Sequence, residues 1–173
     1  MDTFLEVLKY VLPLGVALLA AYFILKAYLD HEMKKKKAEL KKDDRQVTLP
    51  LQLQAYERLI LLLERISPAQ LVIRALLPGM GPYQFQTVLL QSIREEFEHN
   101  QTQQVYVSDE AWLKVKQARE ELVRLINISA TDGREELSAN DLARHILDEW
   151  SKLDRNPIQL AIDRLKNDAR ELL

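Results

Sequence analysis

The sequence predicts an all-α protein with one transmembrane helix near its N-terminus, a charged stalk and a helical bundle. Three observations lead to this prediction. Residues 10–25 form an apolar run without a charge, a lysine-rich segment follows, and later apolar residues recur at three- and four-residue steps. The single strand candidate, residues 105–107, is too short to build a sheet. We therefore expect an anchor at 1–29, a stalk at 30–47 and a helical domain at 48–173.

The apolar run is long enough to cross a bilayer. With Lys9 and Lys26 snorkelling outward, the span reaches roughly twenty residues, which covers about 30 Å of hydrocarbon as a helix. A cleavable signal peptide is one alternative, but it would begin with positive charge, whereas Asp2 and Glu6 come first here. A helix buried in a protein core is the other alternative, because a run without a polar face can be enclosed by a core as well as by a membrane. We therefore interpret the run as a membrane span.

Charge sets the expected orientation of the span. Eight basic residues follow it as far as Arg45, and only Lys9 precedes it. Because lysine and arginine stay on the cytoplasmic side, we expect the N-terminus outside and the domain in the cytoplasm, with the span in the inner membrane. The absence of cysteine agrees with a reducing compartment. Four stalk residues are also candidate contacts for anionic lipid: Lys34, Lys35, Lys36 and Lys37.

The domain at 48–173 contains repeated helix-start signals, each a capping residue or a proline in the first turn. They are Thr48 with Pro50, Ser67 with Pro68, Pro82, Ser108, Ser138 with Asp141, and Asn156 with Pro157. The segment 78–82, PGMGP, is the clearest joint, and Asp132 with Gly133 should end the helix that Ser108 begins. The pattern predicts about six helices, with antiparallel neighbours where the loops are short.

No residue pattern in the domain indicates an enzymatic chemistry. The chain has no cysteine, no G-x-S-x-G elbow and only four glycines, so a glycine-rich phosphate cradle cannot form. Two groups have metal-ligand spacing on a helix: Glu96 with His99, and Asp141 and His145 with Glu149. Polar pairing at a helix surface is the commoner explanation of both groups. We therefore expect a non-catalytic protein without a cofactor.

Arg74 is the one charged residue in a predicted helix, AQLVIRALL (residues 69–77), that is apolar on nearly every side. Such a helix is expected to be mostly buried, and a buried charge requires a partner. Glu57 and Glu64 on the preceding helix are the nearest candidates in sequence for a structural ion pair. The alternative is an arginine that binds a partner protein.

The domain is mildly acidic, since 15 lysines and arginines stand against 19 acidic residues from residue 46 onward, a net charge of −4. This balance argues against a nucleic-acid partner. We expect a membrane-anchored adaptor or accessory subunit that scaffolds a membrane-bound assembly, with other proteins as partners and homo-oligomer formation as an option. A membrane-tethered metal-dependent enzyme and a sensor of anionic lipid surfaces are the alternatives.

The segment 49–59 reads LPLQLQAYERL and follows the span and the lysine stalk. In this arrangement the chain resembles an uncharacterised family of bacterial single-pass inner-membrane proteins, and the resemblance covers most of its length. It implies one N-terminal span and a helical cytosolic domain. It implies no established activity and supplies no catalytic residues.

Overall fold

A computed structural model describes the backbone of residues 2–131 and 138–173. Within these residues it describes the side chains of residues 19, 22–36, 45–131 and 138–173. Every regular element in the described residues is helical, which confirms the predicted all-α class: six α-helices and one 3-10 helix. The chain divides into two compact units, Met1–Thr48 and Leu49–Leu173.

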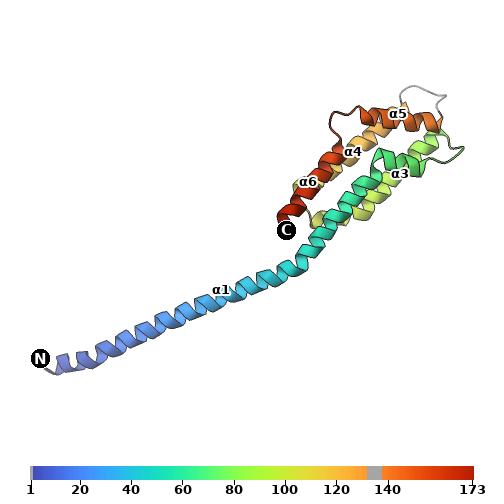
Figure 1. Cartoon of the computed structure of the whole chain (residues 1–173). Helices are drawn as coiled ribbons and strands as arrows, with labels where there is room; N and C mark the ends of the chain where they lie inside the picture. Colours follow the sequence, from blue (N-terminus) through green and yellow to red (C-terminus); the bar gives the residue numbers. More distant parts are fainter. Residues whose placement is uncertain (1, 132–137) are drawn as a thin grey trace. The chain divides into compact units, whose positions relative to one another are not determined.

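The first helix, α1, spans Asp2–Ile66 (Figure 1). It includes the stalk residues 30–47, so the stalk is helical. It also passes through Thr48 and Pro50 without ending, and the helix start predicted there is wrong. Proline inside a helix removes one backbone hydrogen bond and costs about 3 kcal/mol. The helix formers on both sides and the burial of the following turns offset this local cost, because Ala55 is fully buried.

The remaining elements all lie in the unit Leu49–Leu173. They are α2 (Pro68–Ala75), α3 (Pro82–Asn100), η1 (Gln101–Val105), α4 (Asp109–Thr131), α5 (Ala139–Ser151) and α6 (Pro157–Leu172). The other predicted starts agree with these bounds to within a residue or two. The expected helix end at Asp132 and Gly133 lies outside the described residues. Of the β-favouring residues 105–107, Val105 ends a 3-10 helix and the next two form a turn after it, so they do not form a strand.

Two of the caps form in detail as the sequence predicts. The Ser138 hydroxyl accepts a hydrogen bond from the Asp141 backbone N–H at 3.2 Å, and the Asp141 carboxylate accepts one from the Ser138 N–H at 3.3 Å. The Asn156 side-chain oxygen accepts bonds from the first two free N–H groups of α6, at 3.0 and 3.2 Å. These contacts satisfy backbone donors that a helix N-terminus otherwise leaves without partners.

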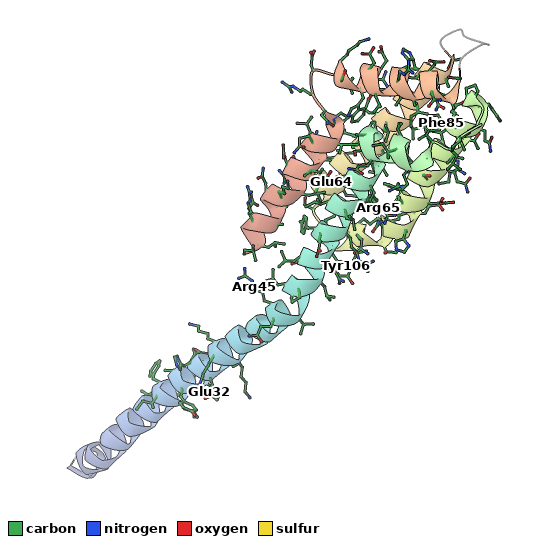
Figure 2. The ribbon with its side chains drawn as sticks, turned by 45° about the vertical axis from the view of Figure 1, so that its right-hand side comes forward. Glu32, Arg45, Glu64, Arg65, Phe85 and Tyr106 are labelled. Atoms are coloured by element: carbon green, nitrogen blue, oxygen red, sulfur yellow. The ribbon has the colours of Figure 1, made fainter. Side chains whose placement is uncertain are left out.

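Helix α4 lies at the centre of this unit, where it packs against α3, α5 and α6 (Figure 1). Its inward residues are fully buried and recur at three- and four-residue steps: Val115, Ala118, Leu122 and Ile126. Phe85 of α3, labelled in Figure 2, is also fully buried. The end of α1 contributes Leu59 and Leu63 to the same core. Burial of each large aliphatic side chain contributes about 1.5–3 kcal/mol.

Candidate functional site

Arg74 lies on the exposed face of α2, so the burial expected for it is not observed. The helix is amphipathic at the surface: Ile73 is 80% exposed, while the opposite face is buried through Leu71, Val72 and Ala75. The Arg74 guanidinium donates to the backbone carbonyl of Arg65 at 3.2 Å. Among the described side chains, it forms no ion pair with Glu57 or Glu64.

The acidic contact in this region belongs instead to Arg65, which pairs with Glu96 of α3 at 2.7 Å. Figure 2 labels Arg65 on the part of α1 that belongs to the bundle. A polar cavity of about 430 Å³ surrounds the pair, and Arg74 and His99 also line it. Glu96, the carboxylate of the Glu96 and His99 spacing, is thus paired with a guanidinium.

The second candidate metal group also has its carboxylates engaged. Asp141 belongs to the α5 capping box, and its hydrogen bonds with Ser138 hold the pKa of that carboxyl below its ordinary value. Glu149 pairs with Lys152 at 2.9 Å. Hydrogen bonds to Asp148 and Glu149 in turn raise the pKa of Lys152. Across the part of the chain that the structure describes, no three His, Cys, Asp or Glu side chains gather in a metal-binding arrangement.

A buried polar cluster that the sequence analysis missed joins α4 to α6. Ser108, the residue before α4, donates its hydroxyl hydrogen bond to Asp168 and accepts one from the Ala111 N–H at 3.1 Å. The other Asp168 oxygen faces Nε of Arg164 at 2.8 Å, as an ion pair without hydrogen-bond geometry. Arg164 also reaches Glu110 at 3.2 Å.

Tyr56 of α1 lies against this cluster. Burial raises the pKa of its phenol, the hydrogen bond with the Ser108 backbone lowers it, and the nearby Asp168 charge raises it again. The cluster thus involves α1, α4 and α6, and no histidine is among its interacting groups. The Ser108 hydroxyl is thus engaged in the contact between the start of α4 and α6, through the hydrogen bond that it donates to Asp168.

A surface groove of about 500 Å³ lies between α3 and α4, and the sequence analysis missed it as well. We call it the α3–α4 groove. Its floor is apolar, and its sides carry three arginines, one glutamate and one asparagine. The lining residues are Leu90, Ile93, Arg94, Arg119, Glu120, Val123, Arg124 and Asn127.

A side-chain contact between α3 and α4 lies near each end of the α3–α4 groove. Near one end, the Gln86 side chain donates to the Asn127 side chain at 3.0 Å. Near the other, the Arg119 guanidinium lies 4.2 Å from the centre of the Phe97 ring. Phe97 stacks in turn on Trp112, with ring centroids 5.2 Å apart. These contacts hold α3 and α4 in antiparallel register and keep Arg119 at the groove.

The predicted anchor, 1–29, has most of its side chains outside the described residues. Within the part that is described, none of the helices combines the length and hydropathy that a membrane crossing requires. Lys34, Lys35 and Lys36 of the stalk are exposed, and the side chain of Lys37 lies outside the described residues.

Taken together, these features define an all-α protein whose compact helical unit carries an amphipathic surface groove. Over residues 2–172 the chain matches the model of a family described as "Family of unknown function (DUF7935)", and it belongs to this family. No curated protein and no solved structure matches the chain significantly. Membership agrees with the resemblance to an uncharacterised family, and the family description assigns no activity to any residue.

Proposed function

We propose that this protein is a membrane-anchored adaptor or accessory subunit that holds a partner protein at the inner membrane of a bacterium. The observation that carries the proposal is the uncharged apolar run at 10–25, which a basic segment follows directly. A run of this length and composition is typical of a membrane span. The charge distribution supports an orientation in which residues 48–173 lie in the cytoplasm.

The adaptor role is supported by how the polar groups of the helical unit are used. Asp168 and Ser108 bind each other, Glu96 neutralises Arg65, and Asp141 caps α5. The described polar clusters are thus occupied by structural contacts. The α3–α4 groove differs, because it is open at the surface and combines apolar and charged side chains. Such a surface suits a protein partner better than a chemical reaction.

Membrane attachment is tested by extraction and by cysteine labelling. Because the sequence contains no cysteine, an introduced cysteine is the single thiol that the reagent can label. We expect the full chain to stay in the membrane pellet after an alkaline carbonate wash. In spheroplasts, a membrane-impermeant maleimide should label Thr3→Cys, whereas Ser151→Cys should react only after lysis. Release by carbonate would contradict the anchor, and the reverse labelling pattern would contradict the orientation.

The adaptor role is tested by purifying the full chain from native membranes in mild detergent. We expect a second protein to co-purify in a constant ratio to this chain, as measured by quantitative mass spectrometry. Elution of the chain by itself, at the mass of a monomer or a homo-oligomer, would contradict the adaptor role while leaving the anchor unaffected.

A further inference from the structure

We propose that the α3–α4 groove binds an acidic amphipathic helix of the partner protein. This inference rests on the proposed adaptor function and specifies the chemistry of the partner. Three features of the groove favour such a partner: the apolar floor, the excess of arginine and the spacing of the charges.

The floor of the groove offers an apolar surface to a third helix. Ile93 is buried in the core. Leu90 of α3 and Val123 of α4 are half-buried and pack against the core on the side of the groove. Two antiparallel helices leave a channel between their ridges, and the side chains of a third helix pack into such a channel. An amphipathic segment would cover Leu90 and Val123 with its apolar face.

The sides of the groove are positive in a unit that is negative. Arg94, Arg119 and Arg124 line the groove together with one acid, Glu120, although the domain carries a net charge of −4. Arg119 lies over Phe97 and 4.0 Å from the Glu120 carboxylate, and Arg124 pairs with Glu121 at 2.6 Å, so Arg94 is the groove arginine that most needs a carboxylate from a partner. Arg94 is exposed, and within the described residues no carboxylate pairs with it. A partner that supplies carboxylates would complement this lining.

The spacing of the arginines fits carboxylates along a helix. Arg119 and Arg124 are five residues apart, which places their backbones about 7.5 Å apart along α4. Acidic residues four apart on a partner helix are separated by about 6 Å along its axis. Along α4 the lining of the groove runs from Arg119 to Asn127, about 12 Å, which is about two turns of a bound helix.

The test uses the full chain in detergent and a fluorescein-labelled synthetic helix as the probe. The probe carries leucines at helical steps on one face and glutamates four apart beside them, and the matched peptide has glutamine in place of glutamate. We expect the glutamate peptide to bind at least about tenfold more tightly, with an affinity that falls as salt rises. Arg94→Glu should weaken this binding about tenfold.

Arg144→Glu on α5 is the matched control, because Arg144 is also exposed, with 82% of its side chain accessible, and lies outside the groove. It should change the affinity less than about twofold. Circular dichroism melts of both variants monitor folding, and Arg94→Gln replaces Arg94→Glu if the charge reversal unfolds the protein. Equal binding of the two peptides, unchanged binding by the Arg94 variant, or an equal loss in Arg144→Glu would each overturn the proposal.

A photo-crosslinking amino acid in place of Leu90, in native membranes, identifies the natural occupant. A crosslink to an acidic helix of another protein supports the proposal, and a crosslink between two copies of this chain overturns it. If the protein resists the carbonate wash but binds both peptides equally, the groove inference fails and the proposed membrane anchor stands. If carbonate releases the protein but it prefers the glutamate peptide, the groove inference stands and the proposed membrane attachment fails.

Discussion

Asp168 is a carboxylate with only 7% of its side chain exposed, and its partners are the Ser108 hydroxyl and the Arg164 guanidinium. Removing one partner of a buried ion pair leaves the other charge uncompensated. We predict that Asp168→Ala lowers the free energy of unfolding by about 2–4 kcal/mol, less than for a fully buried pair because Arg164 is partly exposed. Urea denaturation of the full chain in detergent measures the change.

Asp163→Ala is the matched control for this prediction, since Asp163 lies on the same helix but is exposed and accepts a hydrogen bond from Gln159 alone. Its substitution should cost less than about 0.5 kcal/mol. If Asp168→Ala and Asp163→Ala lower the free energy of unfolding equally, the buried cluster does not stabilise the fold more than a surface hydrogen bond does.

We expect Tyr56 to make the stability of the protein sensitive to alkaline pH. Burial raises the pKa of its phenol above the ordinary value of 10.0, so the folded state favours the neutral form. The resulting stability is fully present below pH 10 and is lost as the pH rises through the higher pKa of the folded state. We predict that the urea midpoint falls as the pH rises above about 10, and falls less steeply in Tyr56→Phe.

The 81% exposed Tyr83 provides the comparison for Tyr56. Tyr83→Phe should keep the alkaline slope of the unmodified protein, because it removes an exposed phenol and leaves Tyr56 unchanged. Identical slopes in all three proteins would mean that the environment of Tyr56 does not couple its ionisation to folding.

At the scale of a helix, the N-terminus of α5 is capped by hydrogen bonds between two residues, Ser138 and Asp141. The Ser138 hydroxyl and backbone both bond Asp141, and these bonds lower the pKa of the Asp141 carboxyl. We predict that Ser138→Ala lowers stability by about 1 kcal/mol at neutral pH. Thermal melts followed by circular dichroism measure it, with Ser151→Ala at the other end of α5 as the control.

The same cap should stabilise the protein less in acid than at neutral pH. Because the folded-state pKa of Asp141 is lowered, its contribution is present above the ordinary value of 3.8 and is lost as the pH falls through the lower one. The difference in melting temperature between Ser138→Ala and the unmodified protein should therefore shrink in acid. A constant difference across that range would show that the carboxylate does not take part in the cap.

The helices themselves could largely be predicted because their start signals are local. Ser138 and Asn156 cap helices through atoms two or three residues away, so the sequence contains both partners of each contact. Pro50 was misleading for the opposite reason, since helix continuity depends on the segments on both sides of it. The face that α2 turns to solvent, and with it Arg74, depends on how α2 packs against α3 and α5.

The candidate sites could not be predicted, because their parts are distant in sequence. Ser108 and Asp168 are 60 residues apart, and Gln86 and Asn127 are 41 apart. Only the antiparallel packing of α3 on α4 brings Arg94 into the same groove as Arg119 and Arg124. Neither helix has a distinctive motif at these positions, so periodicity indicates which residues are buried but not which surfaces meet.

At the scale of the whole molecule, charge is unevenly distributed along the chain. Residues 1–48 carry nine basic and seven acidic residues, a net charge of +2, against −4 for the rest. An acidic domain gains nothing from an anionic lipid surface, so electrostatic attraction would come from the basic segment. Attachment by that segment would be reversible by salt, whereas a membrane span resists both salt and carbonate.

This difference defines the last prediction, Leu19→Arg in the middle of the apolar run. An arginine near the centre of a span opposes membrane insertion by about 2.5–3.5 kcal/mol. We therefore expect a large decrease in the carbonate-resistant fraction, measured by quantitative immunoblotting of pellet and supernatant against total protein. Met33→Arg adds the same charge to the basic segment and should leave that fraction unchanged. If Leu19→Arg stays in the pellet as fully as Met33→Arg, the run at 10–25 does not hold the protein in the membrane, and the attachment of the adaptor must be sought elsewhere.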